Sequence, residues 1–284
     1  MLTRLRFLLA IFLSALVAIS VEAASTPTTR RWTIDGVERQ AIVYAPPAAT
    51  TRPSPLVFAW HGHGGTMERF ARTFAIHSHW PEAIVVYPQG LPTPGRLTDP
   101  QGKAPGWQAA PGEQGDRDLK FFDAMLASLE HDYRVDADRV YATGHSNGGT
   151  FTYVLWAART DTFAAFAPAS TALGMLSRQF DSTTAPAHGR ALRPILHIAG
   201  ENDPLVKFPW QQRTMEMIRR INDCGDGQPW EHKGCTLYAS PQGAPVITYI
   251  HPGKHNLPPD AAEVIVKFFR QSSRPAATTH PSRN

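Results

Sequence analysis

Cysteine is scarce in this chain of 284 residues, which contains only Cys224 and Cys235. So low a number excludes the dense disulfide frameworks that hold many small secreted domains together. A chain of this length does not depend on such a framework, because it can bury roughly three quarters of its unfolded surface around a single core. Its 42% of hydrophobic and 18% of charged residues are the balance of an ordinary globular protein.

Clusters of basic residues and long apolar runs are also largely missing. The 28 lysines and arginines are scattered, and the formal net charge is only +4. Without a basic stripe interleaved with aromatic residues, the sequence argues against a nucleic-acid partner. Beyond residue 23, no segment is long and apolar enough to span a bilayer, so no membrane partner is expected once the N-terminus is removed.

The N-terminus has a composition of its own. Arg4 and Arg6 precede an almost unbroken apolar run at residues 7–21, and the small residue Ala23 follows. This order is typical of a signal peptide. The alternative is an uncleaved membrane anchor, but the run is at the short end for spanning about 30 Å of hydrocarbon. We therefore predict a signal peptide over residues 1–23 and a secreted or periplasmic protein, with the oligomeric state left open.

Export from the cytosol bears on the two cysteines. Cys224 and Cys235 lie close in sequence in a chain that leaves a reducing compartment, so we predict one disulfide between them. Closing a loop of that size stabilises a fold by on the order of 3 kcal/mol. A catalytic thiol is the alternative, but neither cysteine stands at a strand-to-helix turn.

Short apolar runs alternate with helical segments along the rest of the chain. The alternation about Asp35-Gly36 predicts a β-hairpin over residues 32–44. Six further runs are typical of strands buried on both faces, at residues 56–60, 83–87, 140–143, 163–167, 195–199 and 246–250. Helices are predicted at residues 118–133, 147–158, 210–221 and 259–270. Together they indicate an α/β fold, with a mostly parallel central sheet and helices on both faces.

One domain over residues 24–270 and a flexible C-terminal tail over residues 271–284 complete the predicted organisation. In parallel sheets of this kind, ligands bind at the carboxyl ends of the strands. Two long loops, at residues 90–115 and 170–193, are of a length that is commonly functional, and the second is a candidate lid. The chemistry is therefore expected in the loops that follow the apolar runs.

Ser146 lies in such a loop, within the sequence Gly144-His-Ser-Asn-Gly148. A G-x-S-x-G pattern between a buried strand and a helix is the nucleophile elbow, whose sharp turn exposes the serine hydroxyl above the sheet. The flanking glycines avoid collisions at the turn. By chance the pattern would occur in under about one chain in ten of this composition, so the motif alone is moderate evidence. Its position after a buried run and before a helix removes most chance matches. Ser146 is the predicted nucleophile.

The partners of such a serine follow in the order acid, then histidine. Asp203 stands in the turn after the run at residues 195–199, and His255 stands in the loop after the last run. An acid that bonds the imidazole would fix its tautomer and stabilise the imidazolium. Glu201 or a helix-capping role for Asp203 is the alternative there, and His251 competes with His255.

A glycine-rich segment, His61-Gly-His-Gly-Gly65, directly follows the first buried run. It is of the HGGG type that forms oxyanion loops. The amides of His63 and Asn147 are the predicted donors to a tetrahedral oxyanion, where losing one donor typically costs about 3 to 4 kcal/mol of barrier. Two histidines could instead begin a metal site, but no further ligand follows in the expected place. No metal and no cofactor are predicted.

With these motifs in place, the chain resembles the secreted polyhydroxybutyrate depolymerase and feruloyl esterase family of α/β-hydrolases. The resemblance runs over roughly residues 39–269 and is carried by Trp60-His-Gly, Tyr87-Pro-Gln-Gly, Asp118-Leu-Lys-Phe-Phe-Asp, Tyr133 to Gly148, Gly200-Glu-Asn-Asp-Pro-Leu-Val and Lys254-His-Asn-Leu-Pro. It implies an α/β-hydrolase fold and ester hydrolysis through an acyl-enzyme on Ser146, Asp203 and His255. The family often has an aromatic residue shortly after that histidine, where this chain has Leu257.

The expected substrate is a small or oligomeric ester, because no residues remain for a polymer-binding domain. A soluble ester, such as a feruloyl or acetyl ester or a short hydroxyalkanoate oligomer, fits at least as well as a solid polyester. Trp107, in the first long loop, either lines the acyl pocket or anchors the loop to the body. A peptidase or thioesterase on the same triad is the alternative enzyme. A non-catalytic binding protein is the alternative outside enzymes, and it predicts the loss of a triad position.

Overall fold

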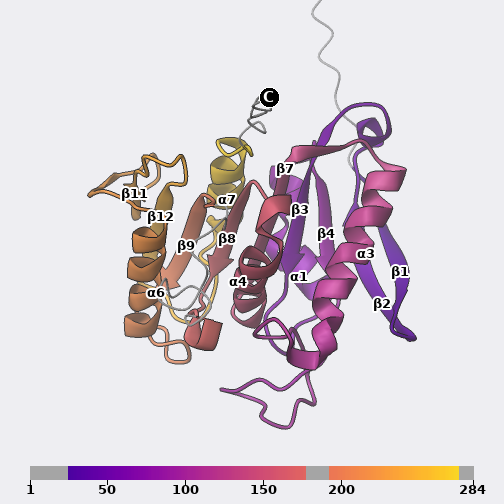
Figure 1. Cartoon of the computed structure of the whole chain (residues 1–284), viewed down its shortest axis with the longest axis horizontal. Helices are drawn as coiled ribbons and strands as arrows, with labels where there is room; N and C mark the ends of the chain where they lie inside the picture. Colours follow the sequence, from indigo (N-terminus) through magenta and orange to yellow (C-terminus); the bar gives the residue numbers. More distant parts are fainter. Residues whose placement is uncertain (1–24, 177–191, 275–284) are drawn as a thin grey trace, which may run out of the picture.

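The structure, a computed structural model, describes residues 25–176 and 192–274. The predicted signal peptide, residues 177–191 of the candidate lid and the chain after residue 274 lie outside the described residues. A ten-stranded sheet has the order β1-β2-β4-β3-β7-β8-β9-β12-β11-β10 (Figure 1). The strands are β1 Pro27–Ile34, β2 Val37–Tyr44, β3 Ser54–Trp60, β4 Ile84–Pro88, β7 Val135–His145, β8 Ala165–Ala169, β9 Ile195–Gly200, β10 Gly227–Pro229, β11 Cys235–Tyr238 and β12 Val246–His251.

The middle of this sheet is parallel and its two edges are antiparallel. Neighbours from β4 to β12 pair in parallel. At one edge β1 and β2 form the predicted hairpin, with Asp35 and Gly36 at positive φ in its turn. At the other edge β10 and β11 form a second hairpin that follows β9 and α6 in the chain and pairs with β12. A small separate hairpin pairs β5 Leu91–Pro92 with β6 Pro105–Gly106.

Helices cover both faces of the sheet (Figure 1). They are α1 Met67–Phe74, α2 Ile76–His79, α3 Arg117–Asp132, α4 Asn147–Arg159, α6 Phe208–Ile221 and α7 Ala261–Arg270, with short 3-10 turns η1 Pro47–Thr50, η2 Glu113–Asp116, η3 Thr160–Thr162 and η4 Gly174–Leu176. Apolar residues of α3, α4 and α6 pack on one face, and those of α1, α2 and α7 pack on the other. None of the helices in the described ranges has the length and apolar character needed to cross a bilayer.

Strand β3 illustrates why these runs form central strands. All seven of its residues are buried. Because successive side chains on a strand point to opposite faces, Phe58 and Trp60 enter the core with α3 and α4, whereas Val57 and Ala59 enter the core with α1 and α7. A strand with a core on each side must be apolar throughout, which is the pattern in the sequence.

The predicted α/β-hydrolase fold is confirmed. Each predicted strand and helix is present with its bounds shifted by a few residues, the largest shifts being at β1, which begins at Pro27, and at β7, which begins at Val135. The short helices α1 and α2 and the hairpin of β10 and β11 were not predicted. The parallel strands place the loops after β3, β7, β9 and β12 at the same edge of the sheet, where the candidate site lies.

Candidate active site

Ser146 stands alone between strand β7, which ends at His145, and helix α4, which begins at Asn147. Its φ of 56° and ψ of −118° lie in a region that side chains rarely adopt, so the turn is strained. The glycines two residues away are required by contact. A Cβ on Gly144 would collide with the carbonyl oxygen of Gly148, and one on Gly148 would collide with that of Trp60.

The structure brings His255 and Asp203 to this serine. His255 Nε2 lies 2.8 Å from Ser146 Oγ, and His255 Nδ1 lies 2.7 Å from Asp203 Oδ2. Asp203 follows β9 and His255 follows β12, which are paired neighbours in the sheet. The three side chains therefore form a continuous hydrogen-bonded chain, with the carboxylate fully buried and the imidazole 18% exposed.

The loops that carry the acid and the histidine are tied together by backbone hydrogen bonds. Glu201 N–H donates to His251 O, and Asn202 N–H donates to Gly253 O. Glu201 is exposed, and among the described residues the carboxylate that bonds His255 is that of Asp203. His251 is buried, and its Nδ1 accepts a hydrogen bond from Gly253 N–H. Burial lowers the pKa of His251, which favours the neutral ring.

Asp203 is surrounded by hydrogen-bond donors. Its Oδ1 accepts from the backbone N–H groups of Leu205 at 2.8 Å and Val206 at 2.9 Å. Its Oδ2 accepts from Gln211 Nε2 at 3.2 Å in addition to His255. Donors of this number stabilise a buried carboxylate in its charged form.

Gln211 is a second buried side chain in contact with Asp203. Its Nε2 also donates to Val206 O at 2.7 Å, and its amide oxygen has no hydrogen-bond partner among the described residues. His197 Nδ1 lies 2.6 Å from the hydroxyl of Tyr153. Burial lowers the pKa of His197 to about 4, and the Gln211 side chain opposes this shift. Among the described residues, His197 Nε2 has no hydrogen-bond partner.

The glycine-rich loop after β3 is held by His61. This ring is buried, its Nδ1 faces Gly62 O at 2.8 Å, and its Nε2 accepts from Gly90 N–H at 3.0 Å. Burial lowers the pKa of His61 to about 4, so the ring is neutral with its proton on Nδ1. His63 points elsewhere, with Nε2 3.2 Å from Asp99 Oδ2.

Both predicted oxyanion donors line the same pocket as Ser146. Within the described part of the chain, the backbone N–H groups of His63 and Asn147 have no hydrogen-bond partner. The Asn147 side chain is fully engaged, because Oδ1 accepts from Trp107 N–H at 2.7 Å and Nδ2 donates to Trp107 O at 2.9 Å. This clamp fixes the first turn of α4 against the loop that carries Trp107.

The prediction that Trp107 might line the acyl pocket is wrong. Its side chain is fully buried, its Nε1 donates to His61 O at 2.8 Å, and its ring packs edge-on against Trp60. The anchoring alternative fits, since the indole holds the loop to the core through both the ring and its N–H.

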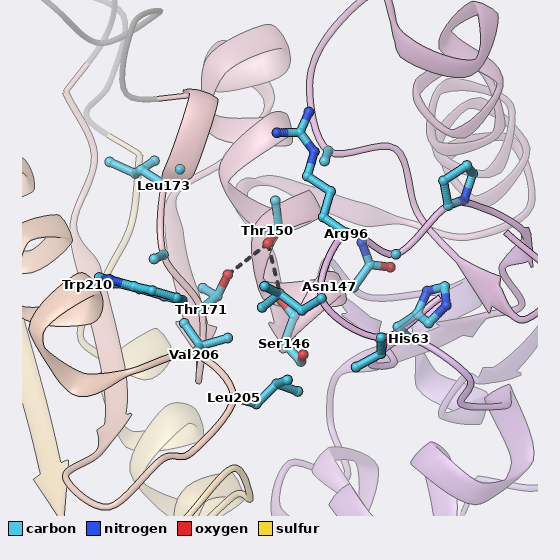
Figure 2. Close-up of a pocket in the computed structure, with 17 residues that line it drawn as sticks. His63, Arg96, Ser146, Asn147, Thr150, Thr171, Leu173, Leu205, Val206 and Trp210 are labelled. Carbon is cyan, nitrogen blue, oxygen red and sulfur yellow. Dashed lines mark hydrogen bonds between the residues drawn. The ribbon is translucent and has the colours of Figure 1, made fainter. Parts of the chain in front are cut away.

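A pocket opens beside Ser146 and encloses about 990 Å³, part of it open to solvent (Figure 2). Leu173, Leu205, Val206 and Trp210 form an apolar wall. Polar groups line the rest: the pair Thr150 and Thr171, whose hydroxyls are 2.8 Å apart, with His63, Asn147 and Arg96. Leu173 and Trp210 lie on the opposite side of Figure 2 from His63, with Ser146 between them.

Comparisons with known proteins give one family model and several esterases. The model of the prolyl oligopeptidase family matches residues 106–190. Feruloyl esterase D of Neurospora crassa is 28% identical over 285 residues, which cover 89% of this chain and 90% of that protein. Putative esterase NocK of Nocardia uniformis subsp. tsuyamanensis is 31% identical over 193 residues, which cover 66% of this chain and about half, 51%, of NocK.

Among solved structures, an acetyl xylan esterase from Aspergillus awamori has a TM-score of 0.63 at 14% identity, over 86% of this chain and 99% of that one. A ferulic acid esterase has a TM-score of 0.60 at 15% identity, over 87% and 97%. The chain has the α/β-hydrolase fold, and these relatives support a feruloyl esterase-like family within it. This places it among the carboxylic ester hydrolases.

In this α/β-hydrolase the predicted disulfide between Cys224 and Cys235 is wrong, because both thiols are free. Cys235 begins β11 and lies beside Trp230, which donates its backbone N–H to Cys235 O at 3.1 Å. Cys224 precedes β10, six residues before Trp230 along the same extended segment. At about 3.3 Å per residue the cysteines lie roughly 20 Å apart, whereas a disulfide needs Cα atoms within about 7 Å.

His61 and His63 do not form part of a metal site in the described ranges, where no three histidine, cysteine or acidic side chains are grouped suitably. His145 lies beside the candidate base, with its ring 4.9 Å from that of His255. Burial and, to a smaller extent, the neighbouring His255 lower the pKa of His145 to about 4. A neutral ring at this place adds no second positive charge when His255 takes a proton.

Proposed function

We propose that this protein is an exported serine esterase that hydrolyses carboxylic esters through an acyl-enzyme. Ser146 is the nucleophile, His255 the general base and Asp203 the acid that orients the base. The observation that carries the proposal is the hydrogen-bonded chain from Ser146 Oγ to His255 at 2.8 Å and from His255 to Asp203 at 2.7 Å. A strained serine with ready access to a base has little reason to persist without chemistry.

Acylation begins when Ser146 Oγ attacks the ester carbonyl carbon and His255 Nε2 takes the hydroxyl proton. The carbonyl oxygen becomes an oxyanion, to which the N–H groups of His63 and Asn147 donate. Asp203 stabilises the imidazolium through Nδ1–H. His255 then gives its proton to the alcohol oxygen, the bond between that oxygen and the carbonyl carbon breaks, and the alcohol leaves.

Deacylation repeats these steps with water. His255 takes a proton from a water molecule, the hydroxide attacks the acyl carbon, and a second oxyanion forms in the same hole. His255 then protonates Ser146 Oγ as the acid departs, which regenerates the enzyme. The reaction uses the chain's own side chains and backbone only, so we propose that it needs no metal or cofactor.

The substrate class follows from relatives and pocket together. Relatives are named feruloyl esterase D and a bifunctional acetylxylan esterase/xylanase. The apolar wall of Leu173, Leu205, Val206 and Trp210 is suited to an acyl group with a sizeable apolar part. We therefore propose feruloyl or acetyl esters, or short hydroxyalkanoate oligomers, as substrates.

Hydrolysis of a matched panel tests this function. The panel is 4-nitrophenyl acetate, 4-nitrophenyl butyrate, methyl ferulate and a hydroxybutyrate trimer. We expect at least one to be cleaved, and Ser146→Ala to lose at least about a thousandfold in kcat. Ser78→Ala, at an exposed serine on α2, is the matched control. If no ester is cleaved, or if Ser146→Ala keeps its activity, the proposal fails.

The match of residues 106–190 to the prolyl oligopeptidase family favours one second candidate, a peptidase on the same triad. Proline-containing peptide anilides in the same panel separate the two. A rate for the anilides above that for every ester would make the peptidase the better assignment.

Export is the remaining part of the proposal, with removal of residues 1–23 leaving the domain at residues 24–270. We expect the protein expressed with its full N-terminus in a bacterial host to begin at Ala24 in the periplasm or the medium. Mass spectrometry of the N-terminal peptide measures this, and an intact Met1 on the active protein would contradict it.

A further inference from the structure

The pocket beside Ser146 lies on one particular side of the candidate triad. Ser146, Asn147 and His63 line it, but His255 is not among the described residues that do so. In ester hydrolysis the departing alcohol must lie next to His255 Nε2, which protonates it. The acyl part extends away from that nitrogen. The pocket is therefore placed to receive the acyl group, and not the alcohol.

Among the described residues that line this pocket, Arg96 is the one arginine or lysine, and none of them has a carboxylate side chain. Figure 2 shows Arg96 on the opposite side of the pocket from Leu205, with its guanidinium turned away from Ser146 Oγ. An acyl group would thus meet apolar side chains and threonine hydroxyls near the reacting carbon, and a cation farther out.

The Arg96 guanidinium is only weakly committed to a partner of its own. It lies 3.4 Å from Glu113 Oε1, and the two side chains are 56% and 34% exposed. Exposed ion pairs of this kind contribute little to stability. Glu113 is meanwhile held by Ala109 N–H, which donates to its other oxygen at 2.9 Å. A ligand carboxylate could take the place of Glu113 at a small free-energy cost.

The backbone that carries Arg96 is fixed against the oxyanion loop. Gly95 and Asp99 exchange two backbone hydrogen bonds at 2.8 Å, which close a tight turn with Arg96 inside it. Asp99 Oδ2 accepts from Ala104 N–H at 2.8 Å and lies 3.2 Å from His63 Nε2. Arg117 secures the base of the same hairpin through Thr93 Oγ1 at 2.6 Å. The backbone that carries the Arg96 guanidinium is therefore held in place.

From this arrangement we propose that the pocket selects acyl groups that end in a carboxylate, with Arg96 binding that carboxylate beyond an apolar middle section. The proposal rests on the proposed esterase function and assigns its acyl specificity. Substrates of this class are monoesters of dicarboxylic acids, in which one carboxyl is esterified and the other is free. Arginine suits this role because its planar guanidinium donates two parallel hydrogen bonds to a carboxylate.

The test compares two esters that differ only in the terminal charge: mono(4-nitrophenyl) adipate and its methyl-capped diester, 4-nitrophenyl methyl adipate. Release of 4-nitrophenolate gives kcat/KM for each. We expect the kcat/KM of the wild type to be at least about tenfold higher for the anionic ester. This is the factor expected from one hydrogen bond between charged groups. Arg96→Gln is expected to bring the ratio of the two kcat/KM values close to 1, and Arg96→Lys to give an intermediate ratio.

Two controls sharpen the comparison. Arg220→Gln removes an exposed arginine at the far end of α6 and is expected to keep the wild-type ratio. Raising the KCl concentration from 0.05 to 0.5 M is a second control, for which we expect a lower ratio in the wild type and little change in Arg96→Gln.

The outcomes separate the two levels of the proposal. If neither ester is cleaved, the esterase function itself fails. If both are cleaved at similar rates, or the neutral one is favoured, the acyl specificity is overturned while the esterase function stands. If the wild type favours the anionic ester and Arg96→Gln does so equally, a different group binds the carboxylate and the assignment of Arg96 is overturned.

Discussion

Strand β12 ends at His251, and His255 lies in the loop that follows; their neighbours give these two histidines different roles. His255 Nε2 is 2.8 Å from Ser146 Oγ, whereas His251 Nδ1 is occupied by Gly253 N–H at 3.1 Å. We expect His255→Gln to lose at least about a thousandfold in kcat, since a glutamine has no basic nitrogen to take the serine proton. The esters of the panel provide the rates.

His251→Gln is the matched control for that variant. His251 is buried with its Nε2 unpartnered among the described residues, so an amide of similar size is expected to keep kcat within about tenfold. A loss in His251→Gln as large as that in His255→Gln would make His251 the base and would contradict the assignment.

Gln211 touches the acid and not the reacting atoms, so we regard it as a positioning residue. Its Nε2 donates to Asp203 Oδ2 at 3.2 Å from a fully buried amide. We expect Gln211→Leu to lower kcat/KM by roughly tenfold, because one donor to a charged group is lost. It is also expected to move the acidic limb of the pH profile of kcat/KM to lower pH, since an acid that is less firmly held stabilises the imidazolium less.

The adjacent Gln212 is exposed on the same helix and supplies the control for Gln211. Gln212→Leu changes the same residue type without touching Asp203. A shift of the pH profile in Gln212→Leu, or its absence in Gln211→Leu, would show that Gln211 has a structural role only.

At the scale of elements, the turn between β7 and α4 requires the backbone at Gly148 to contact the backbone at the end of β3 directly. A Cβ on Gly148 would collide with the carbonyl oxygens of Trp60 and His61, which belong to the strand beside β7 and its following loop. We expect Gly148→Ala to lower the free energy of unfolding by about 1 to 3 kcal/mol, the usual range for overpacking. Urea unfolding followed by circular dichroism measures this.

Gly225 offers a control for the elbow, because a Cβ there would meet only Ala239 O at 3.9 Å. Gly225→Ala is expected to change the free energy of unfolding by less than about 1 kcal/mol. If both variants unfold at the same urea concentration, the close approach at Gly148 has no energetic weight.

Elements with a core on both sides were predictable, and small ones at the edge were not. Strand β3 is buried at all seven positions, so its apolar run is unambiguous. Helix α1 was missed although it carries the usual signals, a Thr66 cap that accepts from Arg69 N–H and buried residues Met67, Phe70 and Phe74 at helical spacing. Helix α1 has only eight residues, and the glycine-rich segment before it makes the helical spacing of its apolar residues hard to recognise.

The hairpin of β10 and β11 was missed for a different physical reason. β10 is three exposed residues with a proline, so neither composition nor burial marks it as a strand. The hairpin also bears on the disulfide prediction, because that prediction used closeness in sequence alone, and the strand β10 lies between the two cysteines. The positions of Trp107 and Arg96 likewise depend on how a long loop folds back, which local patterns do not encode.

For the whole molecule, the two cores hold the sheet between layers of helices and bury several histidines in the process. His61, His145 and His197 lie in or beside the loops and strands that carry the candidate site, and burial lowers the pKa of each to about 4. None is the candidate base. They serve as neutral hydrogen-bonding groups, and the fold depends on their remaining neutral.

This dependence gives the protein a stability that falls in mild acid. In the unfolded chain each of these histidines takes a proton near pH 6.5, but in the folded chain it does so only near pH 4. Between these values the unfolded state binds more protons, so the free energy of unfolding falls as the pH falls. Each histidine contributes a slope of up to about 1.4 kcal/mol per pH unit.

We therefore expect a combined slope approaching about 4 kcal/mol per pH unit between pH 6 and pH 5, above the range in which most carboxylates titrate. Urea unfolding at several pH values measures it. His197→Gln keeps a polar group opposite Tyr153 and Gln211 but removes one titrating ring, so its slope should be lower by about 1.4 kcal/mol per pH unit, whatever its stability at pH 7.5. An unchanged slope in this variant would mean that His197 is already charged in the folded protein, and that its burial does not keep the ring neutral.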